Sequence, residues 1–212
     1  MPLIKELNLS GAWLASLDGK NYFKAQVPGL ISAPKVINNG PVFYKRQIEL
    51  PDWDFGVAAL TLKGARFCPK VYINDKLICQ KEGGMAQTVC CISKNDFDLN
   101  AANELKIELM SLRDISIDDA SRIPDADWWR TNVSSHLWDD CTLNFYKDVC
   151  FTRVVPFTDF ESKRLTLKYE IGIFGRMPAD VKTCILDGDT VVCGKTAPAG
   201  ASGDQHSRNA IK

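Results

Sequence analysis

The residues best suited to chemistry gather in the segment from Ser121 to Leu143, SRIPDADWWRTNVSSHLWDDCTL. It holds three tryptophans, two arginines and four aspartates, and it follows neither the 3.6-residue period of a helix nor the two-residue period of a strand. Aromatic rings stack on the apolar faces of sugars, and carboxylates accept hydrogen bonds from sugar hydroxyls. The segment therefore predicts an irregular surface that faces a sugar.

Five residues of this segment are candidates for binding a substrate: Asp127, Trp128, Trp129, Arg130 and His136. The Asp127 carboxylate suits a sugar hydroxyl, and a loop aspartate that accepts hydrogen bonds from backbone N–H groups is an equal alternative. Trp128 and Trp129 are adjacent and point to opposite sides of an extended chain, so at most one of them packs in the core. For Arg130 the favoured alternative is a structural ion pair, and for His136 it is a solvated loop histidine rather than a proton carrier.

Other aromatic residues are predicted to have structural roles. Trp13 is expected to anchor the core, and Tyr44 and Tyr72 lie in strand-like runs that favour packing over ligand binding. Trp138 is expected in the core or in a contact between domains, in preference to stacking on a sugar.

Charge and hydropathy exclude several classes of partner. Lys plus Arg and Asp plus Glu number 26 each in the 212 residues, so the formal net charge is zero, and no basic cluster indicates nucleic acid or an anionic membrane. No apolar run approaches the roughly 20 residues that span a bilayer, and the N-terminus lacks the apolar segment of a signal peptide. We therefore expect no nucleic-acid or membrane partner and favour a cytoplasmic location, with export as the alternative.

The eight cysteines argue against a metal site. None forms a C-x-x-C pair and the chain has only two histidines, so we expect no metal and no cofactor. Most of the cysteines lie in strand-like runs, where cysteine behaves as a small buried hydrophobe, and this favours free thiols. The alternative is an oxidised chain in which Cys184 and Cys193 face each other across a hairpin at Asp187-Gly188.

The hydrophobic pattern predicts an all-β protein. From Arg164 to Ile173 every second residue is apolar, and Glu104 to Leu109 repeats the pattern, as expected of half-buried strands. Val42 to Leu50 is similar but is interrupted by Arg46. Asn74-Asp75 predicts a tight hairpin turn. Short strands separated by turns every 8–12 residues favour a sandwich of two antiparallel sheets.

The strand series divides near Lys147. We predict one domain over residues 1–147, a second over 148–194 and a disordered tail over 195–212, which has no periodic apolar pattern. The second series has about four strand candidates, whereas an immunoglobulin-like sandwich needs about seven. The second domain is therefore expected to be partial, with unpaired apolar strands such as the one holding Leu165, Leu167 and Tyr169. Unpaired edges favour self-association, so a homo-oligomer is a possible state.

Several short motifs occur in an order that points to one family. They are Val27-Pro28-Gly29, Phe43-Tyr44-Lys45-Arg46, Val71-Tyr72-Ile73-Asn74, Gly83-Gly84, Asn103-Glu104-Leu105, Asp125 to Arg130, and Leu137 to Asp140. Together they resemble the N-terminal sugar-binding domain of the family-two glycoside hydrolases, the group of β-galactosidases, β-glucuronidases and β-mannosidases. Lys147 to Tyr169 then resembles the opening of the immunoglobulin-like second domain of that family.

The resemblance implies a fold and a function. It implies a jelly-roll β-sandwich followed by a partial immunoglobulin-like β-sandwich, in a chain that lacks the catalytic barrel. It also implies that Asp127 contacts the sugar, as an aspartate in a similar position does in the β-galactosidase branch. Retaining glycoside hydrolysis needs two carboxyls about 5 Å apart, and no acidic residue here lies in a catalytic signature. We therefore expect no catalytic residue, and a non-catalytic part of a β-glycosidase; the alternative is a free-standing carbohydrate-binding module.

Overall fold

The computed structural model describes residues 5–31, 40–115, 123, 135–176, 180–198 and 206–211, the last of these for the backbone alone. Apart from two short 3-10 helices, η1 (Lys94–Asp96) and η2 (Leu112–Asp114), its regular structure consists of antiparallel β-strands. The all-β prediction is confirmed. Among the described residues there is no helix long and apolar enough to cross a membrane.

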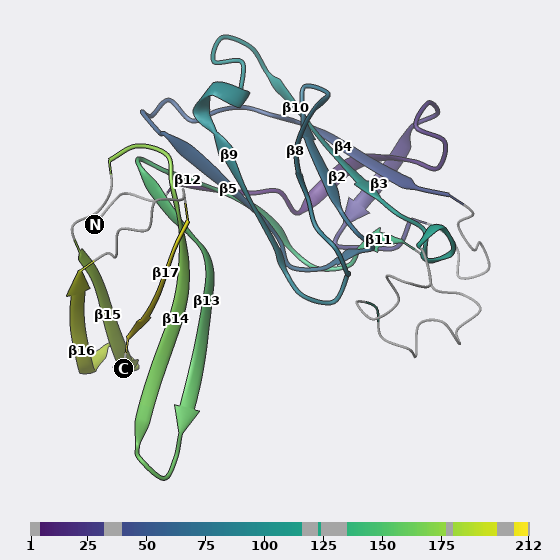
Figure 1. Cartoon of the computed structure of the whole chain (residues 1–212). Coiled ribbons are helices and arrows are strands. Elements are labelled where there is room, and N and C mark those ends of the chain that lie inside the picture. The colour runs from purple at the N-terminus through teal and green to yellow at the C-terminus, as the bar shows by residue number, and fades with distance from the viewer. Residues whose placement is uncertain are drawn as a thin grey trace.

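Two sheets form a sandwich (Figure 1). The four-stranded sheet has the order β1 (Lys5–Asn8), β12 (Cys141–Tyr146), β5 (Val57–Leu62) and β9 (Thr88–Ser93). The six-stranded sheet has the order β3 (Phe23–Val27), β2 (Gly11–Ser16), β4 (Val42–Ile48), β10 (Asn103–Leu109), β7 (Lys70–Ile73) and β8 (Lys76–Gln80). At one end a two-stranded ribbon joins β6 (Ala65–Arg66) to β11 (His136–Leu137).

Alternating side chains build the core between these sheets. In β10, Leu105, Ile107 and Leu109 are fully buried while the residues between them are partly exposed. Trp13 and Tyr44 meet edge to face in the core, with ring centroids 6.4 Å apart. The predicted inward faces of these strands and the anchoring role of Trp13 are confirmed, since one face of each strand must be removed from water.

The predicted hairpin at Asn74-Asp75 is also confirmed. Tyr72 pairs with Leu77 and Ile73 with Lys76, which leaves Asn74 and Asp75 as the two turn residues. Both have positive φ, 49° and 63°, as a type I′ turn requires. Asp75 also forms an ion pair with Lys106 of the neighbouring β10.

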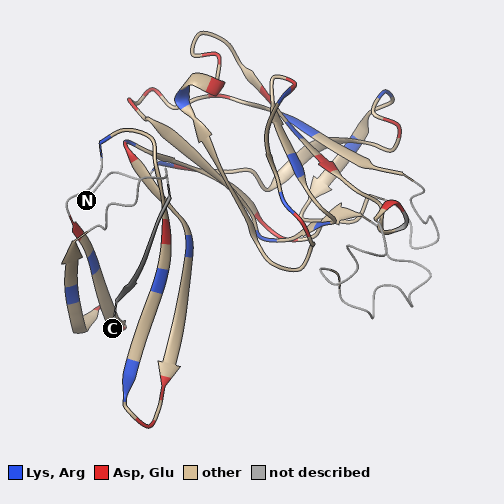
Figure 2. Cartoon of the chain, in the orientation of Figure 1, with Lys and Arg blue, Asp and Glu red and all other residues tan. Residues whose placement is uncertain are grey.

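A second group of strands follows the sandwich. One sheet has the order β13 (Val149–Asp159), β14 (Arg164–Ile173) and β17 (His206–Ile211), and a hairpin joins β15 (Asp180–Asp187) to β16 (Thr190–Pro198). In Figure 1 these strands extend away from the sandwich. Charges of both signs are interspersed over both groups of strands (Figure 2), in keeping with the zero net charge.

The structure differs from prediction at the C-terminal end. Residues 195–212 were expected to be a disordered tail, but β16 continues to Pro198 and β17 pairs with β14. The open edge of β14 offers backbone donors and acceptors, and a segment can pair with them even if its sequence has no apolar period. Hydrophobic periodicity therefore cannot predict a strand of this kind.

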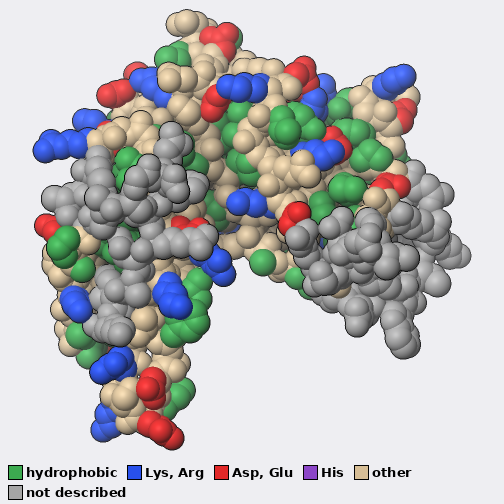
Figure 3. All heavy atoms as spheres, viewed as in Figure 1, with side chains coloured by type: hydrophobic (Ala, Val, Ile, Leu, Met, Phe, Trp, Pro, Cys, Tyr) green, Lys and Arg blue, Asp and Glu red, His purple; other side chains and the backbone are tan. Residues whose placement is uncertain are grey.

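Two further expectations about this region need correction. Tyr169 is buried and Leu165 and Leu167 are half-buried. Exposed apolar side chains lie instead on β13, for example Val154, and on the β15–β16 hairpin, for example Val192. Green side chains reach the surface along the β13–β14 hairpin (Figure 3).

The suggestion that Cys184 and Cys193 face each other across the hairpin is also wrong. Cys184 pairs with Gly194, and Cys193 pairs with Ile185. Adjacent positions in a strand point to opposite faces, so these two thiols do not meet. All eight cysteines are free in this structure.

Candidate functional site

The ribbon of β6 and β11 positions the segment with the predicted site residues. His136 lies opposite Arg66, and Leu137 lies opposite Ala65. The carbonyl of Leu137 also accepts a hydrogen bond of 3.1 Å from the backbone N–H of Gly29. The Val27-Pro28-Gly29 motif therefore braces the strand by which the segment returns to the sandwich.

The described residues that flank the segment 116–134 lie at the same end of the sandwich. Before it, Ile115 is buried against Phe67, and Ile123, the one described residue within the segment, joins the same cluster. After it, the Ser135 hydroxyl donates a hydrogen bond of 2.7 Å to the carbonyl of Met110. The backbone N–H of Met110 in turn donates to the carbonyl of Phe67 at 2.8 Å. The two ends are therefore fixed within one connected group of residues.

Four of the five predicted binding residues lie outside the described residues. These are Asp127, Trp128, Trp129 and Arg130, and their assignment to a sugar stays a prediction. The anchors on either side place the start and the end of their segment at the β6–β11 end of the sandwich.

His136 is a strand residue and is only 9% exposed. The expectation that it is a solvated loop histidine is wrong. The sequence did not predict this strand, because an element of two residues is too short to show a hydrophobic period. Its contact with a substrate stays a prediction.

Trp138 follows β11 and is 37% exposed, so it does not lie in the core, which was one of the two places expected for it. The other, a contact between domains, stays a prediction. Its backbone N–H donates to the carbonyl of Gly64 at 3.0 Å. A Cβ atom at Gly64 would lie 2.5 Å from two atoms of the Trp138 ring, so the indole covers this glycine closely. One ring face rests on backbone, which leaves an aromatic surface at the same end of the sandwich as the β6–β11 ribbon.

An ion pair joins the two chain segments that hold Gly64 and Trp138. Lys63 and Asp140 form an ion pair of 2.9 Å, and the Ser10 hydroxyl donates to the second carboxylate oxygen of Asp140 at 3.3 Å. The hydrogen bond from the Lys63 ammonium lowers the pKa of Asp140, and the same bond raises the pKa of Lys63. About half of each side chain is exposed, so water screens the pair, and it provides charged hydrogen-bonding groups rather than much stability.

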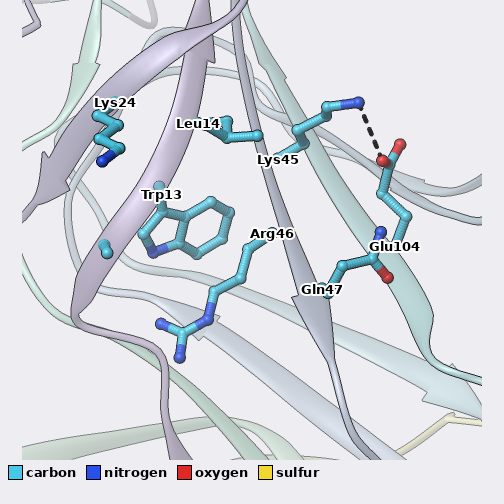
Figure 4. A pocket seen from close by; sticks show the side chains of 8 residues that line it. Trp13, Leu14, Lys24, Lys45, Arg46, Gln47 and Glu104 are labelled. Carbon is cyan, nitrogen blue, oxygen red and sulfur yellow. Dashed lines mark ion pairs between the residues drawn. The ribbon is translucent and has the colours of Figure 1, made fainter.

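A hollow opens on the six-stranded sheet, where β2 and β4 separate. Their pairing begins only at Leu14 and Lys45, so Ala12 and Trp13 have no partner across the gap. The hollow has a volume of about 480 Å³ and is lined by Ala12, Trp13, Leu14, Lys24, Lys45, Arg46, Gln47 and Glu104 (Figure 4).

Arg46 and Trp13 share one acceptor at this hollow. The Arg46 guanidinium donates to the carbonyl of Leu9 at 2.8 Å, and the Trp13 indole N–H donates to the same oxygen at 2.7 Å. In the sequence, Arg46 interrupts the apolar face of its strand and ends the Phe43-Tyr44-Lys45-Arg46 motif. A charged residue at an inward position of a strand was the signal that the sheet opens there.

The side chains that line the hollow suit ligand binding rather than catalysis of hydrolysis. Among its described lining residues the one carboxylate is Glu104, which pairs with Lys45 at 3.1 Å. Retaining glycoside hydrolysis requires two carboxyls about 5 Å apart, and this lining does not supply them. Across the described ranges, no group of three or more His, Cys, Asp and Glu residues is arranged to hold a metal ion.

Comparison with solved structures identifies the fold. The chain superimposes on a GH2 β-galacturonidase from Eisenbergiella tayi with a TM-score of 0.69 and 15% identity, covering 99% of this chain and 37% of that one. A putative β-galactosidase from Bacteroides fragilis gives 0.70 and 17%, covering 98% and 35%. A β-D-mannosidase from Dictyoglomus thermophilum gives 0.64 and 15%, covering 98% and 31%.

The fold is that of GH2 glycosidases. The chain spans about a third of the length of these structures, so it matches one part of each and nearly all of itself. No protein-family model and no curated protein sequence matches the chain. At this identity the likeness to a GH2 glycosidase establishes the fold alone, and the sandwich that sequence analysis predicted is confirmed.

Proposed function

We propose that this chain is the non-catalytic part of a GH2 glycosidase that hydrolyses terminal β-glycosides with retention. The observation that carries the proposal is the coverage, in which 98–99% of the chain matches only 31–40% of each GH2 structure. The remaining 60–69% of each of these structures lies outside the match, and there we place the catalytic barrel. The domain limits 1–147 and 148–194 are part of this proposal, because β12 ends at Tyr146 and β13 begins at Val149.

The proposed role of the chain is to brace a catalytic barrel and to shape the sugar site. The segment with Asp127, Trp128, Trp129 and Arg130 supplies the sugar contacts, and Trp138 adds a ring at the same end of the sandwich. The anchors at Ile115 and Ser135 support this role, because binding groups must be held by a rigid scaffold to be selective.

The test is an assay of the isolated chain and of the product of its complete reading frame. With the nitrophenyl β-glycosides of galactose, galacturonate, glucuronate and mannose, we expect no turnover by the isolated chain above a buffer blank. The complete product is expected to hydrolyse at least one of them with retention. Turnover by the isolated chain that disappears when one of its acids is mutated would contradict the proposal, as would a complete product with no barrel.

A free-standing carbohydrate-binding module is the second candidate function. It is favoured by the hollow at β2 and β4, whose donors Lys24, Arg46 and Gln47 suit sugar hydroxyls and whose volume suits a small ligand. Glycan-array binding by the isolated chain, lost in Lys24→Ala and unchanged in Asp189→Ala on the β15–β16 turn, would support this candidate. Binding that does not depend on Lys24 would exclude the hollow.

A further inference from the structure

Two cysteine thiols meet where the sandwich joins the second group of strands. The Sγ atoms of Cys91 in β9 and Cys150 in β13 lie 2.8 Å apart, although 59 positions separate the residues in sequence. Cys150 packs with Val57 and Ala59 in a small apolar cluster that also includes Cys91.

The packing of β13 on the sandwich brings these thiols together. In β5, Ala58 and Leu60 face the sandwich core, whereas Val57 and Ala59 are buried on the opposite face, in the cluster with Cys150. That face is covered because β13 contacts both β5 and β9.

Gly172 leaves space beside the two sulfur atoms. It pairs with Cys150 across β13 and β14, and a Cβ atom at position 172 would lie 3.4 Å and 3.5 Å from the sulfur atoms of Cys91 and Cys150. A larger residue would push on both thiols and on Phe174, which would lie 2.8 Å from that Cβ atom.

The two thiols differ in acidity because of their environments. The hydrogen bond from Cys150 lowers the pKa of the Cys91 thiol, and the same bond together with burial raises the pKa of Cys150. Cys91 is half-buried, whereas Cys150 is 2% exposed. Cys91 is therefore the thiol that ionises first and the one that a small reagent reaches first.

We propose that Cys91 and Cys150 form a redox modification site, at which a disulfide joins the sandwich to β13. The oxidant is a low-molecular-weight disulfide of the glutathione class. The Cys91 thiolate attacks one sulfur of that disulfide, its S–S bond breaks and one small thiol leaves. Cys150 then loses its proton to solvent and attacks the Cys91 sulfur, which expels the second small thiol. Two protein thiols are oxidised and one small disulfide is reduced to two thiols.

The disulfide connects parts of the structure that are otherwise joined through the chain at residues 147–148 and through packing. It closes a loop of about 60 residues in the unfolded chain, which is the situation in which a crosslink removes much unfolded-state entropy. The neighbouring thiols of Cys79 and Cys90 also share a hydrogen bond, but both lie on sandwich strands, so their oxidation would not join the two groups of strands.

The experiment is to incubate the folded, reduced chain with oxidised glutathione, block the remaining thiols and digest with trypsin. We expect the peptide 82–94, which holds Cys90 and Cys91, to be linked to the peptide 148–153, which holds Cys150. The melting temperature should rise by about 5–15 °C and fall back after treatment with dithiothreitol.

Variants assign the bond and keep the proposal open to refutation. Cys91→Ala should lose both the linked peptide and the rise in melting temperature, whereas Cys90→Ala should keep both. If Cys91→Ala does not fold, Cys150→Ala gives the same comparison. A link only between peptides 77–81 and 82–94, or no link to 148–153 in the folded wild-type chain, would overturn the proposal.

Discussion

Gly64 lies directly beneath the indole ring of Trp138. A Cβ atom at position 64 would lie 2.5 Å from two ring atoms of Trp138 and 2.7 Å from the Cβ atom of Asp139. The backbone N–H of Trp138 donates to the carbonyl of Gly64 at 3.0 Å, so the two residues are held together by the main chain as well as by the ring. The absence of a side chain at position 64 is what allows an aromatic residue to lie flat at this end of the sandwich.

Gly64→Ala should therefore displace the Trp138 ring and lower the free energy of unfolding by about 1–3 kcal/mol, the usual cost of overpacking. Urea unfolding of the variant measures this loss. Adding Trp138→Ala should recover part of it, because one of the two clashing groups is then removed. Gly194→Ala is the matched control, since its nearest neighbours would lie at an ordinary 3.5 Å and 3.7 Å. Equal losses in the two glycine variants would show that the ring contact is irrelevant.

Asp127→Ala tests the proposed sugar contact in the complete protein. Loss of a hydrogen bond to a charged acceptor should cost about 1.5–3 kcal/mol, which is roughly a 10- to 150-fold decrease in kcat/KM. The melting temperature should stay nearly unchanged, because the prediction places Asp127 on a surface loop. Steady-state kinetics and thermal unfolding should be measured on the same preparation. Early unfolding with normal turnover per folded molecule would instead make Asp127 a structural loop residue.

Asp18 should make the stability of the chain depend on acid pH. Its carboxylate accepts hydrogen bonds from the backbone N–H groups of Asn21 (2.7 Å) and Lys20 (2.8 Å) and from the side chains of Asn21 and Ser16. These bonds hold the pKa of Asp18 far below its usual value of 3.8. A lowered folded-state pKa means that the unfolded chain takes up the proton first as the pH falls. The stabilisation is therefore complete above the usual carboxyl pKa and is lost progressively as the pH falls below it.

The measurement is the melting temperature of the wild type and of Asp18→Asn between pH 7 and pH 2. The wild type should be the more stable at pH 7, and the difference should shrink below about pH 4, where unfolded-state carboxyls become protonated. Asp189→Asn, at an exposed hairpin turn, serves as the control and should follow the wild-type curve. A difference that stays constant over the whole pH range would rule out a contribution from Asp18 ionisation.

Self-association should depend on the exposed apolar residues of the second group of strands. β13 is one of the two outer strands of its sheet and exposes Val154, and Val192 is exposed on β16. Exposed edges with apolar side chains recruit further chains. Sedimentation velocity should show association that increases with protein concentration and decreases in Val154→Lys combined with Val192→Lys. Leu99→Lys, on a sandwich turn with similar exposure, should leave it unchanged, and a wild-type monomer at every concentration would refute the prediction.

Local sequence was sufficient for several of the strands and for one tight turn. Alternation of apolar and polar residues predicted β10 and β14 correctly. Each of these strands has one buried face, and this produces a two-residue period in the sequence. Asn74-Asp75 located the β7–β8 hairpin because these residue types tolerate positive φ. The order of the motifs in the sequence also indicated the GH2 fold, and the structural comparison confirmed it.

Only the tertiary structure decided which residues meet across long stretches of chain. His136 is buried because β11 pairs with β6, the hollow exists because β2 and β4 separate beyond Leu14, and Cys91 reaches Cys150 because β13 packs across β9. In the same way, β17 pairs with the open edge of β14 although its own sequence has no apolar pattern. Periodicity reports how one strand divides between core and solvent, whereas these contacts arise from how whole sheets pack, pair and separate, and that information is spread over residues far apart in the sequence.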